Sequence, residues 1–149
     1  MKETVILGLG SRLMMDDGIG VYVVERLRDE NPLEKLTYIV GETDIDYCLD
    51  AVRDAQYLVI IDAVSSGTTP GDVTAFSLDR ALGEPLRVWS AHNLHLFDLL
   101  PHFSDGIKGL LIGIEPSDTS FNLGLSNILT GRFGEITGKV KDIIQKTLI

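Results

Sequence analysis

The chain of 149 residues has the length of one domain, and its 44% hydrophobic and 23% charged residues are ordinary for a globular protein. Its net charge of −9 disfavours nucleic acid and anionic membranes as partners, because both are bound mainly through Lys and Arg. The single cysteine excludes an intramolecular disulfide and a zinc site built from cysteines. We expect one domain over residues 1–149, and we favour a monomer.

The start of the chain lacks the pattern of a secretory signal, and no apolar stretch has the length of a membrane span. The expected location is therefore the cytoplasm. Cys48 shares a helical apolar stripe with Ile45, Leu49 and Val52. A free cysteine in such a stripe is predicted to be a core residue rather than a nucleophile.

Short apolar runs alternate along the chain with segments of helical spacing. The runs predict strands at residues 4–9, 36–40, 57–62, 72–77 and 109–114, and a strand or loop at 87–90. Helices are predicted at residues 18–30, 44–54, 78–82, 93–100 (stopped at Pro101) and from 124 or 125 to 148. The composition of residues 65–71, SSGTTPG, predicts a loop.

This alternation predicts an α/β fold, a single three-layer domain with a mostly parallel twisted sheet and helices on both faces. In such sheets, ligands bind beyond the carboxyl ends of the strands. Gly10, Gly41, Asp62 and Glu115 all fall at predicted strand ends. The residues that could carry chemistry are therefore expected along one edge of the sheet.

Two adjacent aspartates, Asp16 and Asp17, follow the first strand inside a glycine-rich turn. One carboxylate there is explained by the start of the next helix, where it would accept hydrogen bonds from free N–H groups. A second, adjacent carboxylate has no such explanation and suggests a bound cation. The sequence alone leaves the structural and the functional interpretation of this pair evenly balanced.

Two further residues could join the aspartates at this edge. Asp62 ends the most apolar run of the chain, YLVIID, so its carboxylate is expected to be buried and to need a cation or hydrogen-bond donors. A cap on the following loop is the structural alternative. His92 follows a strand-like stretch and precedes a predicted helix, whereas His95 and His102 are predicted to be packing residues.

A metal bound by Asp17, Asp62 and His92 would have two oxygen ligands and one nitrogen ligand. This ligand set suits nickel, zinc or iron better than calcium, and three protein ligands leave positions open for a substrate. A serine hydrolase that uses Ser66 or Ser90 with His92 and Asp62 stays open, although the Gly-x-Ser-x-Gly motif is absent. The sequence also lacks His-Glu-x-x-His and a complete dinucleotide fingerprint, so we expect no bound dinucleotide cofactor.

With these residues in place, the chain resembles the hydrogenase maturation proteases, which trim the large-subunit precursor of nickel–iron hydrogenases. The resemblance runs almost from end to end and depends on the order of its motifs. These are GLGSRLMMDDGIG at 8–20, IIDAV at 60–64, SAHNL at 90–94, IGIEP at 112–116 and LGLS at 123–126.

The resemblance implies that Asp17, Asp62 and His92 are the metal-binding and catalytic residues, with Asp16 as a candidate for activating water. It also implies that the metal is nickel already inserted in the precursor, rather than a cofactor that the enzyme holds permanently. The reaction would be removal of a short C-terminal extension from that precursor. A nickel-protein chaperone or metal sensor that binds the precursor without cutting it is the alternative function.

Two departures from the family pattern lie near the predicted site. Ser11 stands where the family commonly has asparagine, and Gly41-Glu42-Thr43 stands where a pair of glycines is usual. Glu42 is expected to add a negative charge beside the site, which could alter the choice of precursor or supply a further ligand. Neither departure falls on a predicted metal ligand.

Overall fold

The computed structural model describes residues 3–30, 35–83, 96–101 and 107–148. Its elements, in chain order, are β1 (Thr4–Leu9), η1 (Met15–Gly18), α1 (Ile19–Glu30), β2 (Leu36–Glu42), α2 (Ile45–Val52), β3 (Tyr57–Ala63), β4 (Val73–Ser77), α3 (Leu78–Gly83), β5 (Lys108–Ile114) and α5 (Asn127–Leu148). Residues 96–101 are also helical, Pro101 included, so the helix predicted there does not end before the proline. The strand or loop predicted at 87–90 lies outside the described residues.

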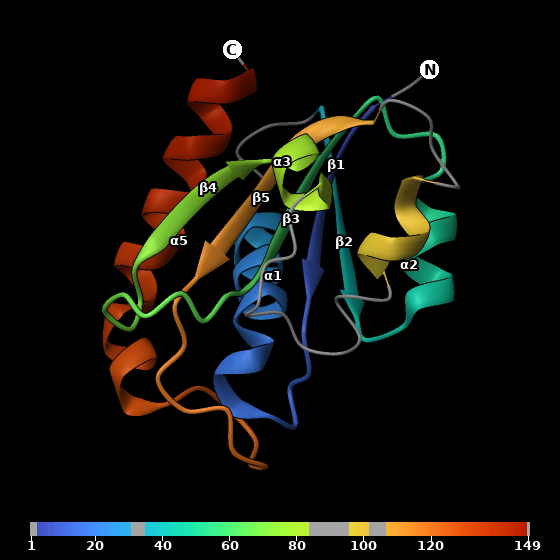
Figure 1. Ribbon diagram of the computed structural model, residues 1–149. Helices are drawn as coiled ribbons and strands as arrows, with labels where there is room; N and C mark the ends of the chain where they lie inside the picture. The colour runs from blue at the N-terminus through green and yellow to red at the C-terminus, as the bar shows by residue number, and fades with distance from the viewer. Residues whose placement is uncertain (1–2, 31–34, 84–95, 102–106, 149) are drawn as a thin grey trace.

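Five strands form one sheet in the order β2-β1-β3-β5-β4 (Figure 1). β1 pairs in parallel with β2 and β3, and β3 with β5, whereas β4 is antiparallel to β5. The connection from β3 to β4 is a loop over residues 64–72 with no helix in it, so β4 turns back at the edge where β3 ends. The predicted mostly parallel sheet is confirmed.

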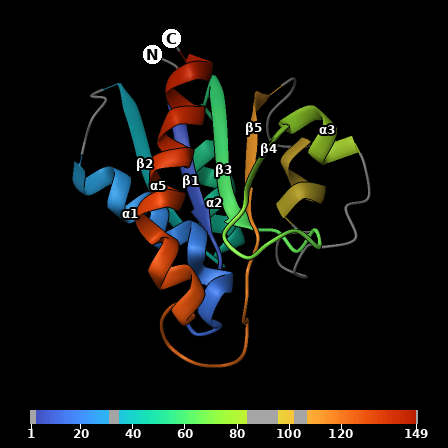
Figure 2. The same ribbon diagram turned by 90° about the vertical axis from the view of Figure 1, so that its left-hand side faces the viewer.

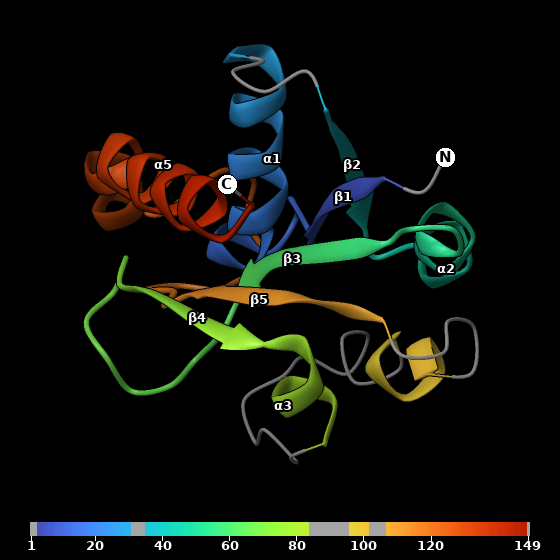
Figure 3. The ribbon, with the colours of Figure 1, turned by 90° about the horizontal axis from the view of Figure 1, so that it is seen from above.

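Helices cover both faces of the sheet, and each face has its own apolar core. α1 and α5 pack on one face (Figure 2), and α2, α3 and the helical residues 96–101 lie on the other (Figure 3). Strand residues alternate between the two cores, with Ile6 and Ile61 facing α1 and α5, and Leu7 and Ile60 facing the other helices. The predicted three-layer α/β architecture is therefore confirmed.

The longest described helix, α5, begins at Asn127, later than the predicted start at residue 124 or 125. Gly124 has a φ of +91°, which a right-handed helix does not allow. Ser126 instead caps the helix, since its hydroxyl oxygen accepts a hydrogen bond from the Leu129 N–H at 3.3 Å. In the described part of the chain, α5 included, no helix combines the length and apolarity that a membrane span needs.

Cys48 is buried, as predicted, with 1% of its surface exposed. Its thiol lies 3.6 Å from the Gly41 carbonyl oxygen, to which it donates a weak hydrogen bond. Burial, aided by the charge of Asp44, raises the pKa of this thiol to about 12. The thiol is therefore protonated at neutral pH, which confirms a packing role rather than a nucleophilic one.

The first turn of α1 lies directly on the backbone of the sheet. A Cβ atom added to Gly20 would be 2.1 Å from the Ile61 carbonyl oxygen and 2.7 Å from that of Leu9. Only a residue without a side chain fits there, so the missing Cβ sets the distance between the helix and the ends of β1 and β3. This contact holds η1, which carries Asp16 and Asp17, against the end of β3.

We expect Gly20→Ala to destabilise the fold by about 4 kcal/mol or more, because the backbone contact must open to admit a methyl group. Gly131→Ala is the matched control, since Gly131 is an exposed glycine in α5 with no atom within 4 Å of its added Cβ. That change should stabilise the protein by up to about 1 kcal/mol through helix propensity. Urea unfolding curves measure both, and equal effects of the two variants would contradict the close approach.

Candidate functional site

Asp17 is positioned by the turn that follows β1. Gly10 has a φ of +127°, and a Cβ atom there would lie 1.9 Å from the Asp17 carbonyl oxygen, so the turn requires glycine. The Ser11 N–H donates a hydrogen bond to Asp17 Oδ2 at 2.9 Å. The Asp17 carboxylate is therefore oriented by the backbone while the residue stays half-buried at the carboxyl edge of the sheet.

Asp62 lies at the end of β3, where it is in register with Gly113 of β5 and has no exposed surface. The Ala63 N–H donates to Asp62 Oδ1 at 2.8 Å. Burial, and then the charge of Asp17, hold the pKa of Asp62 well above its usual range, although the Ala63 hydrogen bond opposes the shift. The two carboxylates are thus close enough to repel each other, and a cation between them would relieve that repulsion.

The third predicted ligand, His92, lies outside the described residues, as do His95, His102 and Ser90. Among the residues that the structure describes, no group of three His, Cys, Asp or Glu side chains could hold a metal ion. The described site therefore contains two of the three predicted ligands, Asp17 and Asp62. The role of His92 stays a prediction.

The neighbouring aspartate, Asp16, points in another direction and is fully buried. Its Oδ2 accepts hydrogen bonds from the Ser117 N–H at 2.9 Å, the Asp118 N–H at 3.0 Å and the Ser126 hydroxyl at 2.7 Å. Its Oδ1 accepts the Ser126 N–H at 2.8 Å. Both oxygens of Asp16 hold the loop between β5 and α5. Asp16 is therefore the structural member of the aspartate pair, and Asp17 is the member that is available to a functional site.

A comparison with known families matches residues 21–146 to the family described as hydrogenase maturation protease. This chain belongs to the hydrogenase maturation protease family. Among its relatives, the hydrogenase expression/formation protein HupD of Rhodobacter capsulatus is 33% identical over 79 residues, or 52% of this chain and 38% of HupD. The chain thus aligns with well under half of that relative's length.

Solved structures agree with the family. The hydrogenase maturating endopeptidase HybD from E. coli superposes with a TM-score of 0.80 at 22% identity, over 98% of this chain and 94% of HybD. The NiFe hydrogenase maturation protease HybD from Thermococcus kodakarensis gives a TM-score of 0.73 at 25% identity, over 95% of this chain and 98% of that chain. The family and the α/β fold predicted from the sequence are confirmed.

The side chain of Ser11, the first departure from the family pattern, stabilises the turn in which it lies. Its hydroxyl oxygen accepts a hydrogen bond from the Leu13 N–H at 3.2 Å, which closes a small turn between the two residues. Its contact with Asp17 comes from the backbone N–H, which any residue except proline supplies. The orientation of Asp17 therefore does not depend on which side chain residue 11 carries.

The second departure, Glu42, does not stand as an isolated negative charge. It lies at the end of β2 with a φ of +52° and forms an ion pair with Arg12 at 3.2 Å. Arg12 also makes a two-pronged ion pair with Glu25, with both distances at 2.8 Å. Arg12 therefore offsets part of the charge that Glu42 brings to this edge of the maturation protease.

A third acidic residue at a strand end, Glu115, organises the loop between β3 and β4. It is 6% exposed, and its carboxylate accepts hydrogen bonds from the Ser66 N–H and from the N–H and hydroxyl of Thr68. The sequence predicts the position of Glu115 at this edge, since a carboxylate follows a buried strand directly, but it does not predict the role of this residue. Ser66, one of the two serines considered as a nucleophile, has an exposed hydroxyl 3.5 Å from that of Thr68.

The contrast between the two aspartates predicts opposite effects of one substitution. Asp16→Asn should destabilise the protein by about 3 kcal/mol, because an amide cannot accept all the hydrogen bonds that converge on the carboxylate. Asp17→Asn is the matched control and should change stability by less than about 1 kcal/mol, since its carboxylate is half-buried. Urea unfolding monitored by circular dichroism measures both, and an Asp16→Asn variant as stable as the wild type would contradict the assigned role.

The raised pKa of Asp62 predicts a pH-dependent stability. Above the usual Asp pKa of about 3.9, the folded protein holds a proton on Asp62 that the unfolded chain has released, so stability falls as the pH rises through the folded pKa. Asp62→Asn removes this dependence. In metal-free buffer, the free energy of unfolding of Asp62→Asn relative to the wild type should therefore rise with pH, by up to about 1.4 kcal/mol per pH unit. A difference that does not change with pH would show that Asp62 is ionised in the folded protein.

Proposed function

We propose that this chain is a cytoplasmic endopeptidase that removes the C-terminal extension of a nickel-loaded nickel–iron hydrogenase large-subunit precursor. In this proposal, Asp17, Asp62 and His92 bind the nickel that the precursor carries. The single observation that supports it most is that the buried Asp62 and the half-buried Asp17 lie at the same carboxyl edge of the sheet, close enough for the charge of Asp17 to help raise the pKa of Asp62. Membership of the hydrogenase maturation protease family supplies the reaction and the class of substrate.

The ligand chemistry fits a metal that arrives as part of the substrate. Two carboxylates and an imidazole leave coordination positions free for ligands that the precursor contributes. Nickel shared in this way would act as a Lewis acid, either on the scissile carbonyl or on a bound water. The protein itself would position that chemistry rather than provide a permanent metal centre.

Backbone hydrogen bonds fix the orientation of both carboxylates. The Ser11 N–H orients Asp17 and the Ala63 N–H orients Asp62, so neither carboxylate depends on a mobile side chain. Because the pKa of Asp62 is raised, binding of a cation releases a proton from this residue when it is protonated beforehand. A nickel-free precursor does not supply the charge that drives this change, which gives a physical reason to discriminate against it.

The decisive experiment compares nickel-loaded and nickel-free precursor from the same source. We expect the wild type to release a C-terminal fragment from the loaded precursor only, as weighed by mass spectrometry. Asp17→Asn and His92→Ala should slow processing by more than about 100-fold, because each removes a metal ligand. Both variants should keep the circular dichroism spectrum of the wild type.

The same assay separates the alternatives. A loaded precursor that is bound and keeps its full mass would identify a chaperone or metal sensor rather than a protease. Loss of cleavage in a Ser66→Ala and Ser90→Ala double variant would identify a serine hydrolase. Full activity of Asp17→Asn would remove that residue from the site.

A further inference from the structure

Exposed apolar side chains gather beside the carboxyl edge of the sheet. Leu13, Phe121 and Leu123 are 55%, 78% and 72% exposed, and they lie on two loops far apart in sequence. The loops adjoin, because the Asn122 N–H donates to the Leu13 carbonyl at 2.9 Å and the Met15 N–H to the Asn122 carbonyl at 3.1 Å. We call Leu13, Phe121 and Leu123 the apolar platform.

The platform is held in place from beneath. The buried Asp16 carboxylate binds Ser117, Asp118 and Ser126, which lie on both sides of the exposed residues 121 and 123. A buried carboxylate, that of Asp16, therefore fixes a loop whose apolar side chains are exposed to solvent. Clustered exposed apolar groups of this kind mark interaction surfaces.

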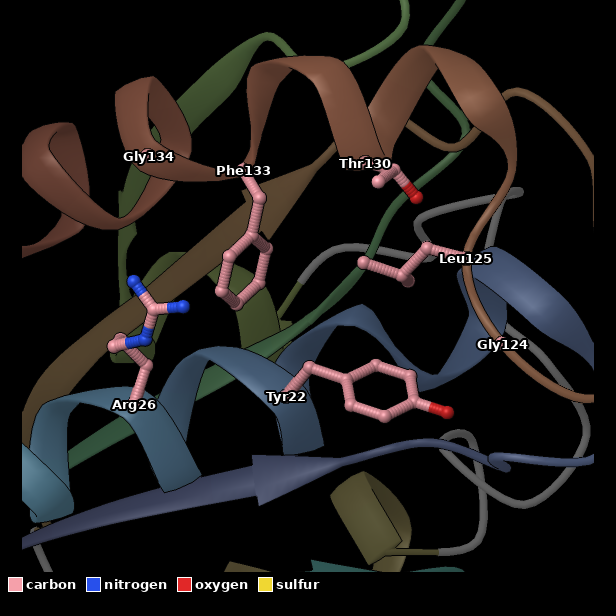
Figure 4. Close-up of a pocket in the computed structure, with 7 residues that line it drawn as sticks. All are labelled: Tyr22, Arg26, Gly124, Leu125, Thr130, Phe133 and Gly134. Atoms are coloured by element: carbon pink, nitrogen blue, oxygen red, sulfur yellow. The ribbon is translucent and has the colours of Figure 1, made fainter.

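A pocket of about 520 Å³ lies between α1 and the first turns of α5 (Figure 4). Gly124 and Leu125 line one end of it, directly after platform residue Leu123. Figure 4 shows the Phe133 ring reaching from α5 toward α1, where Tyr22 forms the facing wall. The walls are therefore largely apolar and aromatic.

The pocket also has a cation at its far end. The Arg26 guanidinium lies 5.0 Å from the centre of the Phe133 ring, and Arg26 is exposed. Among the described residues, no carboxylate forms an ion pair with Arg26; Glu30, whose charge does act on Arg26, is itself paired with Lys141. Arg12 and Arg132, in contrast, are both paired with glutamates. In a chain of net charge −9, this arrangement is complementary to an apolar side chain that lies next to a carboxylate.

We propose that the platform and this pocket form a docking site for an acidic, apolar segment of the hydrogenase precursor. An apolar side chain of that segment lies between Tyr22 and Phe133, and a neighbouring carboxylate pairs with Arg26. Along the helix, Tyr22 lies roughly 8 Å and Arg26 roughly 13 Å beyond Asp17, so one bound protein spans both sites. This inference rests on the proposed function for the identity of the partner.

The test measures binding of nickel-free precursor, which is not cleaved and does not bridge the carboxylates with nickel. We expect Arg26→Glu and Leu123→Ser each to raise the Kd about tenfold, a loss of about 1.4 kcal/mol. The matched controls are Arg28→Glu, an exposed arginine of α1, and Tyr47→Ser, an exposed aromatic residue of α2 on the opposite face of the sheet. Both controls should stay within about twofold of the wild-type Kd.

Failure of this inference is distinguishable from failure of the proposed function. Wild-type affinity in the Arg26 and Leu123 variants, or no measurable binding by the wild type, overturns the docking site even if loaded precursor is cleaved. Binding that depends on these residues without any cleavage supports the docking site and overturns the protease. A wild-type dimer that Leu123→Ser converts to monomer in sedimentation would assign the surface to a second copy of this chain instead.

Discussion

The carboxyl edge of this molecule depends on one buried carboxylate. Asp16 comes directly after the turn that follows β1, yet it binds Ser117, Asp118 and Ser126, about a hundred positions later in the sequence. Hydrogen bonds from neutral donors to a charged acceptor are strong, and four of them offset the cost of burying the carboxylate. These hydrogen bonds connect the residues just before α1 to the loop just before α5. They therefore help to fix the position of Asp17, which follows Asp16 directly.

Asp16 and Asp62 are equally buried, and the difference between them shows how the fold separates structure from chemistry. The donors around Asp16 come from the loop between β5 and α5, so this carboxylate holds the backbone of that loop. Asp62 accepts the N–H of its neighbour Ala63, and its pKa is still raised by burial and by Asp17. An arrangement that opposes ionisation is unfavourable for stability and favourable for binding a cation, which is typical of functional sites.

Most of the fold could be predicted from the sequence, because apolar periodicity is strong in the buried strands and β1 was placed at its observed bounds, Thr4–Leu9. The antiparallel direction of β4 could not be predicted, because it depends on how the loop before it turns back. The late start of α5 could not be predicted either, because it depends on the left-handed conformation of Gly124. Asp16 and Asp17 could not be told apart either, because the donors that bind Asp16 are distant in sequence. Glu115 was found at the edge by position alone, and its partners lie in another loop.

The loop that Asp16 anchors serves two purposes at once. It carries the exposed Phe121 and Leu123, and its other contact, through Asn122, holds the turn that contains Leu13 and leads to Asp17. Any movement of this loop would therefore shift the apolar platform and the carboxylate site together. For the proposed reaction on a folded precursor, this coupling would keep the proposed docking surface and the two carboxylates in a fixed geometry. The geometry of the apolar platform and that of the carboxylate site therefore have a common structural origin, the burial of Asp16 beneath the loop.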